Sequence, residues 1–91
     1  MNRYEVGMLA ISKAGHDLNH LYVVVKEEGE YVFLSDGRIR TLDRPKKKKK
    51  KHIQPVCEIS SIIADKISSG KKIENEDIKR IIKLYSAKKN G

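Results

Sequence analysis

The sequence is poor in the residues on which secreted, membrane-spanning and disulfide-bonded proteins depend. It has one cysteine, no tryptophan and one phenylalanine among 91 residues. The single cysteine, Cys57, cannot form a disulfide within the chain, so we expect an intracellular, cytoplasmic protein. No apolar run approaches the length of about 18 residues that a membrane span needs. The first residues also lack the apolar run of a signal peptide.

The chain offers no recognisable catalytic or metal-binding set. Its three histidines, His16, His20 and His52, do not combine with Cys57 in the spacing of a zinc site. No Ser-His-Asp or Cys-His arrangement stands out. A chain of this length also has too thin a core to enclose an elaborate active site. We therefore expect a non-enzymatic protein without a metal or another cofactor.

What the chain has in excess is positive charge, and most of that charge lies in one segment. The formal net charge is +8. Residues 44–52 contain Arg44 and six consecutive lysines, Lys46 to Lys51, whereas residues 1–43 hold more acidic than basic side chains. Adjacent lysines repel one another, so we do not expect them to be buried. Their density along the chain is close to the phosphate spacing of a nucleic-acid strand, which favours a polyanion as partner.

Alternating and β-branched patterns predict a mainly β fold in the first part of the chain. The predicted strands cover residues 4–11, 21–26, 31–34 and 38–42, and Ile53 is expected to begin a short closing strand. Asp36-Gly37 is a tight-hairpin signal before the fourth strand. Pro45 and Pro55 bracket the lysine run and are expected to limit regular pairing between them. Four or five short antiparallel strands favour a small barrel, because closing the sheet removes exposed edges.

After Pro55 the apolar period changes to that of two helices. The first helix has Ile59, Ile62, Ile63 and Ile67 on one face and is expected to end at Gly70; the second has Ile78, Ile81, Ile82 and Tyr85. Asn75 is expected to cap the second helix. The periodicity leaves open whether the apolar faces pack on each other, on the sheet or on a partner. The expected division is a barrel over residues 1–55, which includes the basic loop 44–52, and a helical extension over residues 56–91.

Three segments of the chain form a further pattern. They are Ser12-Lys13-Ala14-Gly15-His16-Asp17 followed by Tyr22-Val23-Val24; Asp36-Gly37-Arg38-Ile39-Arg40; and Pro45-Lys46-Lys47-Lys48 running on to Lys51-His52-Ile53. In this order and spacing, and over about half of the chain, they resemble the KOW-domain RNA-binding proteins, relatives of an archaeal-type large-subunit ribosomal protein. The resemblance implies an SH3-like barrel and RNA binding, often on the ribosome. This chain has Leu18 and Asn19 where the family usually has a basic residue and a second glycine.

The candidate RNA-binding residues come from the resemblance and from the charge pattern. The resemblance implies that the loop around Gly15 faces RNA, although Gly15 also has a simpler role as a turn glycine. Arg38 and Arg40 lie two apart on a predicted strand, so they share a face. That face is either solvated or part of a basic stripe that continues to the lysine run. The candidates are Lys13, Gly15, His16, Arg38, Arg40, Arg44, Lys46, Lys47, Lys48, Lys49, Lys50, Lys51 and His52.

The aromatic residues are predicted to serve the core rather than a binding surface. They are Tyr4, Tyr22, Tyr31, Phe33 and Tyr85, and four of the five fall within apolar strand or helix patterns. Single-strand readers usually carry aromatic stacking platforms. We therefore expect recognition of the backbone and shape of RNA, with little reading of the bases.

The sequence thus favours a non-enzymatic RNA-binding protein whose lysines contact the phosphates of structured RNA, as a ribosomal or ribosome-associated protein of translation. Two alternatives stay open. One is a nucleoid-type DNA-binding protein that uses the same charge, and the other is an adaptor whose C-terminal helices bind a protein partner. Residues 45–52 also resemble a nuclear-import signal, a pattern that composition alone matches often.

Overall fold

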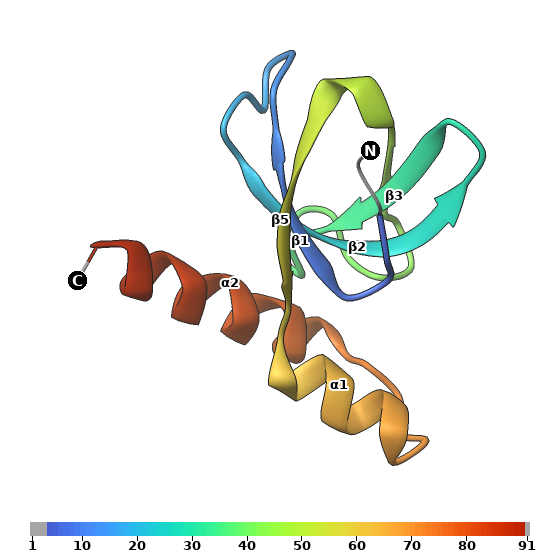
Figure 1. Cartoon of the computed structure of the whole chain (residues 1–91), viewed down its shortest axis with the longest axis vertical. Helices are drawn as coiled ribbons and strands as arrows, with labels where there is room; N and C mark the ends of the chain where they lie inside the picture. Colours follow the sequence, from blue (N-terminus) through green and yellow to red (C-terminus); the bar gives the residue numbers. More distant parts are fainter. Residues whose placement is uncertain (1–3, 91) are drawn as a thin grey trace.

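The computed structural model of the chain describes residues 4–90, without the side chains of residues 57–59 and 88–90. Within this part, five β-strands precede two helices (Figure 1). The strands are β1 (Met8–Ser12), β2 (Leu21–Glu28), β3 (Tyr31–Ser35), β4 (Lys46–Lys49) and β5 (Ile53–Ile59); a short 3-10 helix, η1 (Lys50–His52), joins the last two; and α1 (Ser61–Ser68) and α2 (Asn75–Asn90) follow. The predicted mainly β fold followed by two helices is confirmed.

The five strands form one antiparallel sheet that curls on itself. Their order is β4-β3-β2-β1-β5, so the two edge strands, β4 and β5, are neighbours in the sequence. The three residues of η1 connect these edges, and the sheet must curl for the edges to approach one another. The Tyr4 hydroxyl donates to the Lys50 carbonyl over 3.1 Å, and the Lys13 N–H donates to the His52 carbonyl over 2.7 Å. The result is a small barrel-like domain, which Figure 1 shows above the helices.

The curled sheet has an apolar core on each face. Inside the curl lie Tyr4, Met8, Ala10, Tyr22, Val24, Val32, Leu34 and Ile53. On the outer face, Leu9 and Val23 contact Ile63 of α1 and Ile78 and Ile81 of α2. Successive residues of a strand point to opposite faces, so β1 and β2 are apolar on both sides. The helices therefore dock on the barrel through Ile63, Ile78 and Ile81, whereas Ile67 of the predicted apolar face of α1 is 56% exposed. No helix in the described part is long and apolar enough to cross a membrane.

The predicted strand over residues 38–42 does not form. Residues 36–45 make a loop that the Asp36 carboxylate organises, because its Oδ1 accepts the N–H groups of Arg38 and Arg40, both over 2.9 Å. Ser35 Oγ also donates to the Arg40 carbonyl over 2.7 Å. Such local side-chain bonds to the backbone compete with a strand ladder. Asp36-Gly37 consequently opens this loop rather than a hairpin, and β3 pairs with the lysine run instead.

The prediction that Pro45 and Pro55 limit regular strand pairing between them is wrong. β4 begins at Lys46, immediately after Pro45, and pairs with β3 along its whole length. Pro55 lies within β5, opposite Ala10 of β1. β5 is an edge strand that pairs with β1 on one side. The missing N–H of Pro55 therefore removes no hydrogen bond to a strand on the other side. β5 begins at Ile53 as predicted and runs past the expected boundary at residue 55 to Ile59.

The helix ends differ from the prediction by one or two residues. Ile59 ends β5 rather than beginning α1, and Ser60 Oγ caps α1 by accepting the Ile62 N–H. Gly70, with φ of 69°, follows the end of α1 as expected.

Asn75 does not cap α2 but lies within it. The Asp77 carboxylate accepts the Glu74 N–H over 2.9 Å, as the acidic residue of a capping box does. The Asn75 Oδ1 instead accepts the Leu42 N–H over 2.8 Å and fastens the loop of residues 36–45 to α2. Gly37 belongs to the same contact, since an added Cβ there would lie 2.6 Å from the Asn75 carbonyl oxygen.

The shared outer core predicts that barrel and helices unfold together. Ile78 is fully buried, so Ile78→Ala should lower the free energy of unfolding by about 2–5 kcal/mol. The helical signal and the tyrosine signal in circular dichroism should still fall in one coincident transition in denaturant. Leu84→Ala, at a position 55% exposed on the same helix, should change stability by less than about 0.5 kcal/mol. Loss of the helical signal ahead of the tyrosine signal would contradict a shared core.

Candidate nucleic-acid interface

The lysine run is an ordered edge strand, not a uniformly solvated loop. In β4, Lys46, Lys47, Lys48 and Lys49 stand opposite Leu34, Phe33, Val32 and Tyr31 of β3. The strand period of two therefore turns alternate lysines to opposite faces. Lys46, Lys48 and Lys50 are partly buried, whereas Lys47, Lys49 and Lys51 are exposed. The expectation that none of these lysines is buried is wrong for Lys48, whose side chain is only 11% exposed.

Asp17, in the loop between β1 and β2, makes this burial tolerable. Its carboxylate lies 2.7 Å from Lys48 Nζ and 2.9 Å from Lys46 Nζ. Ser12 Oγ and the Tyr22 hydroxyl donate to the same carboxylate over 2.9 and 2.8 Å. The Lys48 ammonium also donates to Ser12 Oγ and to the Ala14 carbonyl. Opposite charges with their hydrogen bonds satisfied can be buried, whereas isolated charges cannot.

The protonation states of this cluster follow from its contacts. Burial alone would raise the pKa of Asp17, but the hydrogen bonds from Lys48, Lys46, Tyr22 and Ser12 outweigh burial and hold that pKa far below its usual range. Burial, together with the hydrogen bond to Asp17, raises the pKa of the Tyr22 hydroxyl. Asp17 is therefore a carboxylate and Tyr22 a neutral donor throughout the physiological pH range.

The third inward lysine has its own partner. Lys50 Nζ lies 2.5 Å from Glu27 Oε2 and 5.5 Å from the centre of the Tyr4 ring. The alternate lysines thus have two different roles. Lys46 and Lys48 share the single charge of Asp17, and Lys50 pairs with Glu27, whereas Lys47, Lys49 and Lys51 stay outside.

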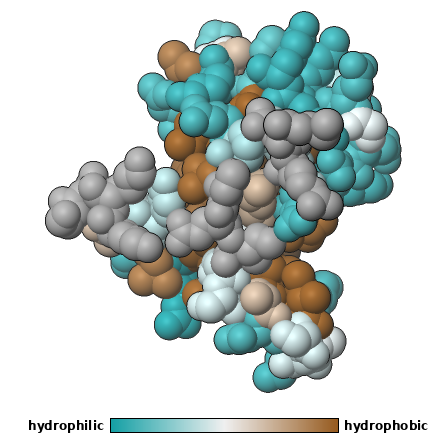
Figure 2. All heavy atoms as spheres, viewed as in Figure 1, coloured by the Kyte–Doolittle hydropathy of each residue, from teal (hydrophilic) through white to brown (hydrophobic). Residues whose placement is uncertain are grey.

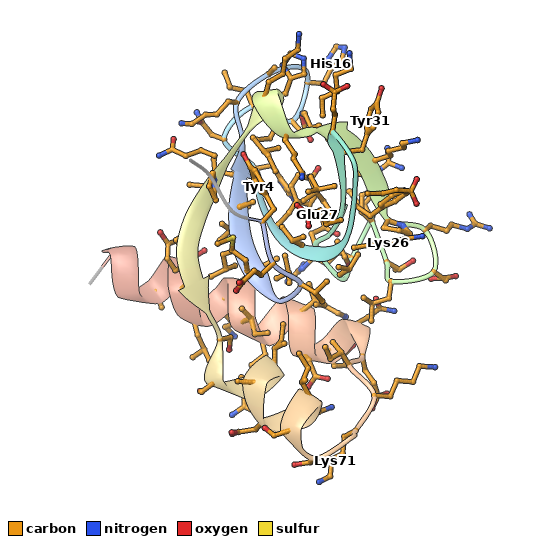
Figure 3. The ribbon with its side chains drawn as sticks, turned by 45° about the vertical axis from the view of Figure 1, so that its right-hand side comes forward. Tyr4, His16, Lys26, Glu27, Tyr31 and Lys71 are labelled. Atoms are coloured by element: carbon orange, nitrogen blue, oxygen red, sulfur yellow. The ribbon has the colours of Figure 1, made fainter. Side chains whose placement is uncertain are left out.

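The β1–β2 loop lies beside the lysine strand, because Asp17 of the loop pairs with Lys46 and Lys48. Lys13, Gly15 and His16 are exposed, and Figure 3 shows His16 at the end of the barrel farthest from Lys71. Gly15 has a φ of 86°, so its role as a turn glycine is confirmed. His52 is half-buried, and its carbonyl accepts the Lys13 N–H.

Asn19 takes the left-handed backbone conformation at the position where the KOW-domain proteins, which the chain resembles, usually have a glycine. Its φ is 70°, and among the described residues it alone of the non-glycine residues has a positive φ. Asparagine is one of the few side chains that adopt this conformation readily. The loop therefore keeps its turn although the glycine is missing.

Arg38, Arg40 and Arg44 are exposed, but they do not form a stripe along a strand. All three lie in the loop of residues 36–45, so their spacing of two no longer places Arg38 and Arg40 on a common strand face. Arg38 instead lines a groove of about 540 Å³ with Lys79 and Lys83 of α2. His20 Nε2, in the same groove, lies 2.9 Å from the Asp36 carboxylate. This second basic surface depends on docking of α2, which the sequence left open.

Two aromatic residues that sequence reasoning assigned to the core lie elsewhere. Tyr4 and Tyr22 are buried as predicted, and Tyr85 packs partly buried against the outer core. Tyr31 and Phe33 alternate with the fully buried Val32 and Leu34, so they point to the outer face of β3 and are only half-buried. All four residues 31–34 are apolar or aromatic, so the pattern gave no signal of which pair faces inward.

The end of the barrel farthest from α1 is mainly hydrophilic. In Figure 2, hydrophilic side chains gather over the upper part of the domain, away from α1. Among the described residues, no three histidine, cysteine or acidic side chains converge in a way that could hold a metal ion. The side chain of Cys57 lies outside the described residues.

The Asp17 cluster predicts a specific loss of stability in acid. A carboxylate whose pKa is depressed in the folded state contributes stability above its usual pKa, near 4, and that contribution is lost as the pH falls below it. Asp17→Asn should lower the free energy of unfolding at pH 7 by about 2–4 kcal/mol, because it leaves Lys46 and Lys48 without their counter-charge.

The same variant should lose less further stability than the parent chain between about pH 5 and pH 2, in urea titrations at each pH. Asp65→Asn, the same change at an exposed site on α1, is the matched control and should follow the parent. An identical acid profile for parent and Asp17→Asn would show that the cluster does not stabilise the fold.

The surface thus combines exposed lysines on a fixed strand, a neighbouring loop with Lys13 and His16, and two half-exposed rings. A scan against protein-family models finds no match, and a search of the curated proteins finds no match. The chemistry of this surface is therefore the basis on which a function is proposed for the chain.

Proposed function

We propose that the chain is a non-enzymatic RNA-binding protein that holds RNA by its phosphates, as a ribosomal or ribosome-associated protein of translation in the cytoplasm. The observation that carries the proposal is the alternation within β4 and η1. Lys47, Lys49 and Lys51 are exposed and, among the described side chains, pair with no acid, whereas Lys46, Lys48 and Lys50 hold the strand in place.

The fixed strand suits a repeating anionic ligand. Lys47 and Lys49 lie two residues apart, about 6.6 Å along a strand, and each strand of a duplex carries one phosphate per about 3.4 Å of the duplex axis, so successive outward lysines can reach different phosphates. Ionic and hydrogen bonds to Asp17 and Glu27 order the backbone before a ligand arrives. Binding therefore does not have to order this segment, and the ordering cost is avoided.

RNA is favoured over other polyanions by the resemblance of three segments to KOW-domain RNA-binding proteins. Two of those segments, around Gly15 and in the lysine run, meet through the Asp17 bonds. The adaptor alternative has less support than RNA binding, because Ile63, Ile78 and Ile81 of the helical faces contact the sheet and Ile67 alone of the predicted residues whose side chains are described is exposed. DNA binding through the same charge is an outcome that the experiments below separate.

Salt dependence tests the phosphate mechanism. If Lys47, Lys49, Lys51 and Lys13 each engage one phosphate, log K should fall with log[salt] with a slope of roughly −3 to −4. Replacing Lys47, Lys49 and Lys51 by Gln should make the slope less negative by about 2 to 3. Fluorescence anisotropy of a labelled RNA hairpin, titrated over a range of KCl concentrations, gives both values.

The matched control removes the same charge elsewhere. Lys71, Lys72 and Arg80 are exposed on the helical side, and Figure 3 places Lys71 at the opposite end from Tyr31. Replacing these three by Gln should leave the slope nearly unchanged. Equal losses in the two triple variants would show that net charge, not this surface, attracts RNA. A parent slope near zero would rule out the phosphate mechanism.

Competition decides between RNA and DNA. An unlabelled RNA hairpin and a DNA duplex with the same number of phosphates should compete for the chain at one salt concentration, the RNA about tenfold more effectively. Co-sedimentation with ribosomes at low and high salt then addresses the ribosomal role. Equal competition by RNA and DNA would indicate general polyanion binding, and absence from the ribosomal fraction even at low salt would remove the ribosome from the proposal.

A further inference from the structure

We propose that the outer face of β2, β3 and β4 is a stacking site for unpaired bases, with Tyr31 and Phe33 as the platforms. The inference rests on the proposed RNA binding and names its substrate class, a single-stranded segment or an unpaired loop of a folded RNA. It differs from the sequence-based expectation that the bases contribute little.

Strand register brings the parts of this site together. Residues directly opposite one another in antiparallel strands point to the same face. Two rows therefore run across the three strands, Lys26–Phe33–Lys47 and Glu28–Tyr31–Lys49. Figure 3 shows Tyr31 and Lys26 on the same side of the barrel, directed away from its interior. Three lysines and one acid thus surround two rings, a composition that favours an anionic ligand with planar groups.

The two rings serve no apolar core. Val32 and Leu34, their neighbours on β3, are fully buried inside the curl, whereas Tyr31 and Phe33 belong to neither core. Lysine ammonium groups lie over them instead. Lys47 Nζ is 4.5 Å from the centre of the Tyr31 ring and 5.9 Å from that of Phe33, and Lys26 Nζ is 5.3 Å from the Phe33 ring.

These lysines can be displaced from the rings without breaking the fold. An ammonium over a ring at an exposed site is held weakly, and the lysine stem is long and flexible. A base can take its place on the ring while the ammonium moves to a neighbouring phosphate. Lys46 and Lys48, which fix the strand, lie on the other face and are not disturbed.

The spacing of the rings fits consecutive unpaired bases. Tyr31 and Phe33 lie two residues apart on one strand, about 6.6 Å, which leaves room for one base on each ring. Aromatic pairs on an exposed sheet stack bases in this way in other RNA-binding folds. Every base has a flat face, so the site is expected to tolerate many sequences. A continuous duplex does not fit, because its bases are already stacked on each other.

Three probes separate stacking from charge: a 12-nucleotide oligouridylate, an abasic ribose-phosphate chain of the same charge, and a 12-base-pair RNA duplex. The full chain should bind oligouridylate more tightly than the abasic chain. Removing the rings in Tyr31→Leu and Phe33→Leu should weaken oligouridylate binding by about tenfold for each ring, with less than about a twofold change for the abasic chain.

Two controls guard against loss of the fold. Tyr31→Phe keeps the ring and should keep the affinity. Leu84→Ala removes an exposed apolar side chain from α2 and should leave all three affinities unchanged.

Tyr31→Trp adds the chain's only indole, and stacked bases should quench its fluorescence upon addition of oligouridylate but not of the abasic chain.

The outcomes separate the two proposals. Equal affinity of the full chain for oligouridylate and the abasic chain, with both lost in the Lys47, Lys49 and Lys51 triple variant, would overturn stacking and leave phosphate binding intact. Quenching of Tyr31→Trp by the abasic chain as strongly as by oligouridylate would also overturn stacking. Failure of the parent chain to bind any of the three probes would overturn the proposed function itself.

Discussion

The ion pairs between Asp17 and two lysines of β4 are the interaction on which the rest of the surface depends. Four consecutive lysines are unfavourable in a paired strand, because their ammonium groups repel one another. The Asp17 carboxylate pairs with both Lys46 and Lys48 and offsets one of their two charges, and strand geometry directs Lys47 and Lys49 outward. The same pairing places β4 beside Tyr31 and Phe33, so the position of the outer charges relative to the rings also follows from Asp17.

The structure joins an anchor and the proposed RNA-binding surface within one segment of six lysines. The inner lysines contribute to folding and the outer lysines remain for a ligand, although all six side chains are chemically identical. Arg38, Lys79 and Lys83 form a second basic region that α2 creates by docking on the sheet. The helical part of the chain therefore contributes charge as well as core, and it cannot be regarded as an independent appendage.

Much of the fold was predictable from local pattern, and the errors have physical causes. The β-branched run of β2 and the helical spacing of Ile78 and Ile81 identified their elements because the apolar periods are clear. The prediction of a strand over residues 38–42 was wrong, because the Asp36 carboxylate accepts the N–H groups of Arg38 and Arg40 and stabilises a loop instead. The burial of Lys48 was not predictable, since its partner Asp17 is distant in the sequence. The outward position of Tyr31 and Phe33 depends on which sheet face encloses the core, and an uninterrupted apolar strand does not specify that.

The uniform composition of β4 has a consequence for how the chain tolerates change. In most strands a shift of one residue exchanges the buried and exposed side chains and is therefore resisted. Here a shift that moves Lys47–Lys50 into the four positions of β4 replaces lysine with lysine throughout, so the side-chain types do not distinguish these two alignments. Backbone hydrogen bonds at the end of the run hold the observed alignment: the Lys50 N–H donates to the Glu30 carbonyl, and the Lys13 N–H donates to the His52 carbonyl. Adding or removing one lysine would therefore change the length of the connection between β4 and β5 and still leave lysines on both faces of β4.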